Sequence, residues 1–133
     1  MKVVLDTNVL MAAFGTRGLC ESVFELCLER HEIVLSEHIF RELQRHLCTK
    51  FRMTEAQAQG VVNFLRENAT VVEPAEMPTS TCRDVDDLPV LGTCQTAGAD
   101  CLVTGDADLL ILSSCGPTKI MTPREFYERM RQE

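Results

Sequence analysis

Short apolar segments alternate with longer amphipathic ones along almost the whole chain, and this alternation constrains the fold more than any other feature. β-branched, apolar runs predict strands at residues 2–5, 32–35, 70–73, 119–121 and 100–106, the last of which runs into a turn. Helical spacing or helix-compatible composition predicts helices at residues 9–14, 19–30, 37–48, 55–68, 88–97, 107–115 and 124–132. Such alternation is typical of a parallel sheet covered by helices. We therefore expect an α/β protein, a three-layer α/β/α sandwich with a central parallel sheet of about five strands.

Several predicted helices carry recognisable end signals. Thr54 and Gln57 have the spacing of a capping box, and Thr122 begins a second box with Pro123 at the first helical position. Ser36 can cap the N-terminus of the 37–48 helix. Gly98 directly follows the 88–97 helix and can end it. The segment 74–87 contains two prolines and several turn formers, so we expect a loop there.

The size of the chain suits one domain spanning residues 1–133, large enough to form a core without disulfides or a structural metal. The seven cysteines are odd in number and include no C-x-x-C, so zinc-finger spacing is absent and we expect reduced, packed thiols. Asp6 interrupts the N-terminal apolar run too early for a signal peptide, and no run approaches the ~20 apolar residues of a membrane span. These features predict a cytoplasmic protein without a membrane partner.

The net charge is −7, with 20 acidic against 13 basic residues, which argues against a protein that coats nucleic acid by electrostatics alone. Aromatic residues are also too scarce for a surface of stacked bases. The charge argument reverses locally if several acids hold a cation, because the cation changes the sign of the field around them.

Acidic side chains gather where the predicted strands end. Asp6 directly follows the first strand, and Asp106 and Asp108 follow the fourth. In an open α/β sheet, ligands bind outside the carboxyl ends of the strands. Asp84, Asp86 and Asp87 precede the helix that leads into the fourth strand. Glu42 lies on the flank of the apolar side of the 37–48 helix. We expect these carboxylates to converge at one edge of the sheet.

Each of these acids taken alone would suit a turn, a helix cap or a solvated helix end, so the prediction of a site depends on their combination. Neighbouring carboxylates raise one another's pKa unless a cation neutralises them, and Mg²⁺ and Mn²⁺ prefer oxygen ligands. Asn8 can cap the following helix or orient a carboxylate. His31, His38 and His46 show no metal-site spacing and are taken as surface or packed residues. An all-carboxylate site favours metal-assisted phosphodiester hydrolysis over zinc chemistry.

Taken in order, these segments resemble the PIN domain, a family of metal-dependent ribonucleases. The similar stretches are VVLDTNVLM, SEHIFRELQRHL, DVDDLPVLGTCQTAGADCLVTGDADLL and TPREFYERM, which together span almost the whole chain. The nearest resemblance is to the VapC-like proteins, the toxin components of prokaryotic toxin–antitoxin pairs. Cys94 and Cys101 depart from the small or apolar residues usual at their positions.

The resemblance implies roles for individual residues. The four acids of the family fall on Asp6, Glu42, Asp87 and Asp106, which would be catalytic and hold Mg²⁺ or Mn²⁺. Asp84 and Asp86 are alternatives to Asp87 or support it. The remaining supporting positions are Asn8, Thr104 and Asp108.

The resemblance also implies an RNA substrate, a protein antitoxin and a homodimer, with the apolar 19–31 segment as a candidate dimer contact. Arg17, Lys50 and Arg52 are candidates for guiding the RNA strand. Two other functions remain as alternatives. A non-catalytic interaction module on the same fold would lack one of the motif acids. A phosphatase with an aspartyl nucleophile would have a second Asp two residues after Asp6, where this chain has Asn8.

Overall fold

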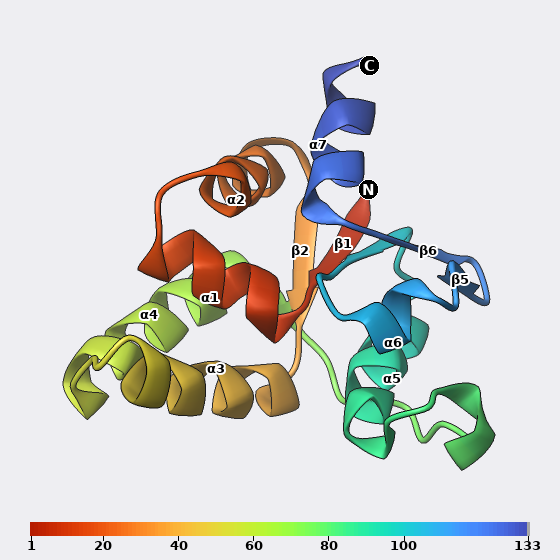
Figure 1. Cartoon of the computed structure of the whole chain (residues 1–133), viewed down its shortest axis with the longest axis horizontal. Helices are drawn as coiled ribbons and strands as arrows, with labels where there is room; N and C mark the ends of the chain where they lie inside the picture. The colour runs from red at the N-terminus through yellow and green to blue at the C-terminus, as the bar shows by residue number, and fades with distance from the viewer. Residues whose placement is uncertain (133) are drawn as a thin grey trace.

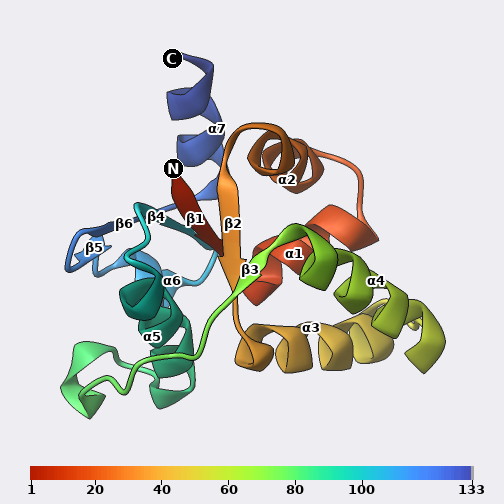
Figure 2. The same ribbon diagram turned by 180° about the vertical axis from the view of Figure 1, so that it is seen from behind.

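Six strands form one sheet in the computed structural model, which describes residues 1–132. The sheet order is β3-β2-β1-β4-β6-β5, with β3 at the edge beside β2 (Figure 2). The strands are β1 Lys2–Leu5, β2 Glu32–Leu35, β3 Thr70–Val71, β4 Cys101–Val103, β5 Ser114–Cys115 and β6 Thr118–Met121. All neighbours pair in parallel except β5 and β6. The parallel strands therefore end together at one edge of the sheet.

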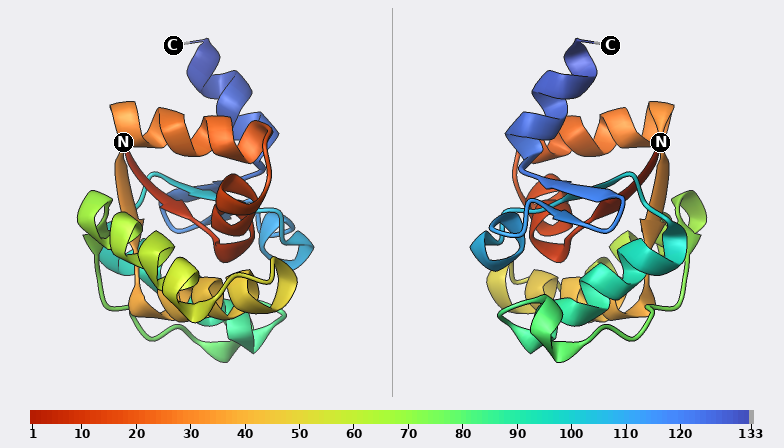
Figure 3. Two further views of the ribbon diagram at one scale, coloured as in Figure 1. Left: turned by 90° about the vertical axis from the view of Figure 1, so that its left-hand side faces the viewer. Right: turned by 90° about the vertical axis from the view of Figure 1, so that its right-hand side faces the viewer.

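Seven α-helices surround this sheet (Figure 1). Their bounds are α1 Thr7–Gly15, α2 Leu19–Arg30, α3 Glu37–Lys50, α4 Glu55–Asn68, α5 Leu88–Ala97, α6 Ala107–Leu110 and α7 Pro123–Arg131. The connections from β1 to β2 and from β2 to β3 carry α1–α4, and the connection back to β4 carries α5. Right-handed crossovers in opposite directions place these two groups on opposite faces of the sheet. The side views show α2 beside α7 and α3 beside α4 (Figure 3).

The central strands are buried on both faces, which explains their continuous apolar sequences. Val3, Val4 and Leu5 of β1 and Leu102 and Val103 of β4 have no exposed surface. The helices contribute the rest of the core through the stripes predicted from their spacing; in α3 these residues are Ile39, Phe40, Leu43 and Leu47. Burial of this kind stabilises the fold by about 25 cal/mol for each Å² of apolar surface. The expected α/β/α sandwich is confirmed.

Both predicted capping boxes are present. Thr54 Oγ1 accepts from the Gln57 amide at 3.1 Å, while Gln57 Oε1 accepts from the Thr54 amide at 2.9 Å. Thr122 and Glu125 make the same reciprocal pair at 3.1 Å. Ser36 is the N-cap residue of α3, but its side chain does not cap the helix; its hydroxyl instead accepts from Thr93 Oγ1 at 2.9 Å. All seven cysteines are free.

The sequence prediction was wrong in two short regions, residues 107–115 and 74–87. The sheet has a sixth strand, β5, which is antiparallel and lies where the 107–115 helix was expected. That helix ends after one turn at Leu110, because Ser113 adopts φ 64° and turns the chain toward a hairpin with Gly116 at φ 57°. The loop 74–87 contains two short 3₁₀ helices, η1 Thr79–Thr81 and η2 Val85–Asp87. The second of them ends at Asp87, one of the acids of the candidate site.

Candidate active site

Asp6 lies at the point where β1 passes into α1, and the residue is 5% exposed. It is the N-cap residue of α1, with Oδ1 accepting from the Thr7 amide at 2.8 Å. Oδ2 accepts from Thr104 Oγ1 at 2.8 Å and from Asn8 Nδ2 at 3.1 Å. Three donors therefore fix a buried carboxylate at the carboxyl end of the sheet. Asn8 orients Asp6 rather than capping the helix, which is the second of its two expected roles.

The same network joins the end of β1 to the end of β4. Asn8 Oδ1 accepts from the Gly105 amide at 2.9 Å, and Thr104 Oγ1 accepts from the Asp106 amide at 3.0 Å. Asp106 in turn caps α6, since its Oδ1 accepts from the Asp108 amide at 3.1 Å. Thr104 is fully buried, so its hydroxyl can serve only these neighbours. Asp6 and Asp106 are thus held by one hydrogen-bond network.

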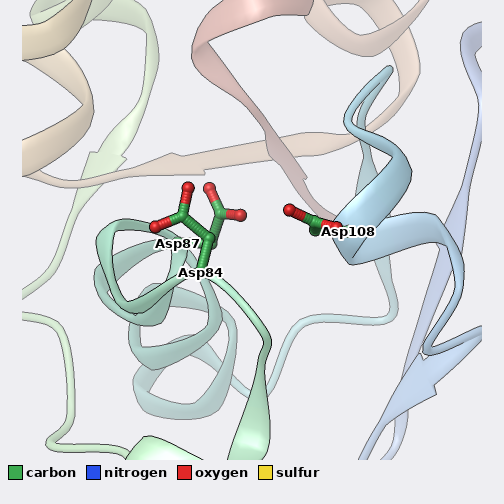
Figure 4. Close-up of side chains that lie close together, drawn as sticks. All are labelled: Asp84, Asp87 and Asp108. Atoms are coloured by element: carbon green, nitrogen blue, oxygen red, sulfur yellow. The ribbon is translucent and has the colours of Figure 1, made fainter.

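The short helix η2 separates the three acids of the 84–87 segment into different surroundings, with Asp84 and Asp87 close together and Asp86 on a neighbouring cavity. Asp84 Oδ1 accepts from the Asp86 amide at 2.9 Å and so caps η2. Asp87 begins α5 without making a capping hydrogen bond, and its Oδ2 is buried with no partner among the described residues. One carboxylate oxygen each from Asp84, Asp87 and Asp108 lies within 4.8 Å of the others (Figure 4).

Glu42 reaches the site from α3. Its Oε1 lies 2.9 Å from His38 Nε2, one turn earlier, and its Oε2 lies 3.9 Å from an Arg45 nitrogen. The side chain of Glu42 is 28% exposed, so these contacts are partly screened by water.

A cavity of about 170 Å³ brings the four predicted acids together, each from a different part of the chain. It is lined by Asp6, Thr7, Asn8, Met11, Glu42, His46, Lys50, Asp87 and Asp106. Asp86 lines a neighbouring cavity of about 400 Å³ together with His38, Arg41, Glu42 and Arg45. Of the three alternatives in the 84–87 segment, Asp87 is therefore the one on the shared cavity.

The proximity of these acids changes their protonation. Burial raises the pKa of Asp6, and the charges of Glu42 and Asp106 raise it further, against the hydrogen bonds from Thr104 and Thr7. Burial also raises the pKa of Asp87, to about 8, together with the hydrogen bond that its protonated form can donate to Asp106 and the charges of Asp106, Asp84 and Asp6. Without a cation, Asp87 therefore retains its proton near neutral pH.

The cavity suits a hard divalent cation. Three buried polar atoms on its lining residues, Thr7 Oγ1, His46 Nδ1 and Asp87 Oδ2, have no hydrogen-bond partner among the described residues. Buried polar atoms are rarely left in this state. The donors are carboxylate oxygens, which Mg²⁺ and Mn²⁺ prefer, and no cysteine or pair of histidines competes for the site. Asp87 belongs both to this cavity and to the group of three carboxylates that it forms with Asp84 and Asp108.

Sequence reasoning missed His38 and His46, which were set aside as surface or packed residues. Both are spaced four residues from Glu42, on the same face of α3, and this spacing was the available signal. Burial, followed by the charges of Lys50 and Arg45, lowers the pKa of His46. Of the three basic residues predicted to guide RNA, Lys50 lines the cavity, Arg17 lies in the exposed turn between α1 and α2, and Arg52 follows α3.

The topology and the acidic cavity define an α/β/α protein with a candidate metal centre at the carboxyl edge of its sheet. The family model of the PIN domain matches residues 2–108, and the chain belongs to this family. PIN domains generally use divalent metal ions and are typically nucleases. A search of the curated proteins gave no significant match.

Two solved structures share the fold at low sequence identity. A chain of VapBC2 from Rickettsia felis, bound to a promoter DNA fragment, superimposes with a TM-score of 0.65 at 14% identity, over 92% of this chain and 98% of that one. A chain of VapBC-1 from nontypeable Haemophilus influenzae gives a TM-score of 0.63 at 19% identity, over 93% and 99%. At these identities the likeness establishes the fold. Within residues 1–132, no helix is long and apolar enough to cross a membrane.

Proposed function

We propose that the protein is an endoribonuclease that hydrolyses RNA phosphodiester bonds with Mg²⁺ or Mn²⁺. The observation that carries this proposal is the convergence of Asp6, Glu42, Asp87 and Asp106 on one cavity of a PIN domain. The raised pKa values of Asp6 and Asp87 show that these two carboxylates are costly to keep ionised beside their acidic neighbours, and a divalent cation removes that cost.

In this mechanism Asp6 and Asp106 hold the metal, while Glu42 and Asp87 complete the site directly or through water. When bound, the cation neutralises the acids, stabilises the charge that develops on the phosphate and provides an activated water as nucleophile. Thr104 and Asn8 keep Asp6 in a single orientation, and the Thr104 hydroxyl and the Asp108 amide do the same for Asp106. Fixed ligands of this kind reduce the reorganisation needed during the reaction.

We further propose that the chain is the toxin of a type II toxin–antitoxin pair in the cytoplasm, inhibited by a protein antitoxin. The two structures compared above are of VapBC2 and VapBC-1, which supports the toxin role. The free cysteines suit a reducing compartment, which supports the cytoplasmic location.

A homodimer is also proposed on the strength of the family resemblance. The sequence suggested that α2 has more apolar side chains than one core needs, but this gives the dimer little support. None of the exposed large apolar side chains among the described residues lies on α2. Phe64 of α4, which is 43% exposed and packs near Phe14 and Phe24, is a more direct candidate contact. Light scattering that gives a 15 kDa monomer would remove this part of the proposal.

The structure argues against an aspartyl-phosphatase reaction at Asp6. Both carboxylate oxygens of Asp6 already accept hydrogen bonds. A phosphatase of this kind would have an acid two residues later, but this chain has Asn8, whose side-chain amide donates to Asp6 and accepts from the Gly105 amide. An interaction module without catalysis is the remaining alternative, and it predicts a chain that binds partners but cuts no RNA.

Cleavage of a labelled single-stranded RNA, with Mg²⁺, Mn²⁺ or EDTA, tests the proposal. The wild type should cut only with a cation, and Asp6→Asn should reduce turnover by at least ~10²-fold. Because Asp6 also accepts hydrogen bonds from Asn8 and Thr104, a thermal melt of the variant must accompany the assay. Equal cleavage by both proteins would assign the activity to another site or a contaminant, and no cleavage by either would favour the interaction module.

A further inference from the structure

One side of α3 carries a row of three chemically different residues along the candidate active site. Glu42, His46 and Lys50 follow at intervals of four residues, and all three line the acidic cavity. Side chains four residues apart lie on one face of a helix, about 6 Å apart along its axis. The row therefore changes from a carboxylate through an imidazole to an ammonium group as it leads away from the acids.

The contacts of His46 make it a hydrogen-bond donor toward a ligand. An Arg45 nitrogen lies 3.5 Å from His46 Nε2, and a guanidinium can only donate, so Nε2 accepts. The neutral ring then carries its hydrogen on Nδ1. This Nδ1 is buried and has no partner among the described residues. A shielded N–H without an acceptor is costly, and an anionic oxygen in the cavity would satisfy it.

Lys50 offers the row an unpaired positive charge. It forms no ion pair within residues 1–132, whereas Arg45 lies 3.9 Å from Glu42 and Arg66 pairs with Glu37. Lys50 is exposed, so a ligand can reach its ammonium group without displacing another residue. The protein as a whole has a net charge of −7, and a polyanion needs such a local cation to approach an acidic cavity.

We propose that His46 and Lys50 form a phosphate-binding track on α3 that holds the RNA strand on one side of the bond to be cut. This inference rests on the proposed ribonuclease function and adds substrate contacts to it. The His46 Nδ1–H donates to a phosphate oxygen close to the acids, and the Lys50 ammonium binds the next phosphate outward. Their separation of one helical turn is comparable with the distance between neighbouring phosphates of an extended strand.

The test measures binding separately from cutting. Affinity for a fluorescent single-stranded oligoribonucleotide is determined by anisotropy with Mn²⁺ at several salt concentrations, in an Asp87→Asn background that removes a proposed ligand charge. Into this background are introduced His46→Leu, His46→Asn and Lys50→Met. Lys119→Met serves as the matched control, because Lys119 lies near the amino end of β6, away from the cavity.

His46→Leu should weaken binding about tenfold or more, the usual effect of removing a hydrogen bond to a charged group. His46→Asn should recover most of the affinity, since its amide nitrogen lies where Nδ1 was. Lys50→Met should reduce the slope of log affinity against log salt by about 0.7, the value for one phosphate contact on a single strand. Lys119→Met should change neither quantity.

Unchanged affinity and salt slope in both His46→Leu and Lys50→Met would overturn the track. Loss of affinity in His46→Asn as large as in His46→Leu would also overturn the hydrogen-bond role, because it would show that only the ring shape matters. The cleavage assay on the wild-type protein separates the two proposals. If the wild type binds RNA through His46 and Lys50 but cuts none with either metal, the nuclease proposal fails while the binding track is supported.

Discussion

Replacement of Asp87 by asparagine should stabilise the metal-free protein, and the gain should grow as the pH rises. Burial and the neighbouring acids raise the pKa of Asp87 from 3.8 to about 8 in the folded state. Between these values the folded protein binds more protons than the unfolded chain, so its free energy of unfolding falls with increasing pH. An amide at position 87 has no proton to lose, and the variant escapes this loss.

Only part of the pKa shift of Asp87 becomes free energy of unfolding, because water reaches part of this side chain and screens its charge. We expect Asp87→Asn to raise the free energy of unfolding by about 1–3 kcal/mol at pH 8. For a domain of this size, that gain corresponds to about 3–10 °C in Tm. Mn²⁺ should favour the wild type instead, since a cation that binds only the folded state stabilises it, and the variant has lost one ligand charge.

Thermal melts in EDTA at about pH 5, 6.5 and 8, repeated with Mn²⁺, measure both effects. Asp86→Asn is the matched control, because it removes the same charge from the adjacent exposed residue, which faces the other cavity. It should show no comparable pH-dependent gain. A difference in Tm between wild type and Asp87→Asn that stays constant from pH 5 to 8 in EDTA would refute the reasoning.

Three further substitutions test the framework of the fold. Thr104→Val removes the buried hydroxyl that donates to Asp6 and accepts from the Asp106 amide, and should cost about 1–3 kcal/mol in urea unfolding and lower RNA cleavage as well. Gly92→Ala places a Cβ 2.2 Å from the Ala75 carbonyl oxygen and should lower the free energy of unfolding in urea by about 1–3 kcal/mol or more. In Gly60→Ala, inside α4, the added Cβ has no atom within 4 Å, so the variant should instead raise the free energy of unfolding by about 0.5–1 kcal/mol. Equal effects of the two alanine substitutions would contradict the expected clash at Gly92.

The fold was largely predictable from the sequence because most elements carry strong periodic patterns and caps. The buried strands read as continuous apolar runs, and the boxes at Thr54 and Thr122 marked helix starts. The two-residue strand β5 and the 3₁₀ turns are too short for any periodicity. Their conformations depend on local turns, such as the positive φ of Ser113, which no spacing rule indicates.

The candidate site was predictable where strand ends decide the position of a side chain. Asp6 and Asp106 follow parallel neighbours β1 and β4, so their convergence follows from the sheet. The choice of Asp87 within its acidic run depends on the direction in which η2 turns, which the sequence left open. The participation of His46 depends on how α3 packs against α1, and this packing is a tertiary feature.

If acids from four separate segments form one cation centre, anomalous diffraction from crystals soaked in Mn²⁺ should locate the cation among them. We expect an anomalous peak in the acidic cavity, within about 2.0–2.3 Å of carboxylate oxygens of Asp6 and Asp106, with Asp87 or Glu42 next to it or joined through water. No peak at millimolar Mn²⁺, or a peak bound only by Asp84 and Asp108 outside the cavity, would contradict it.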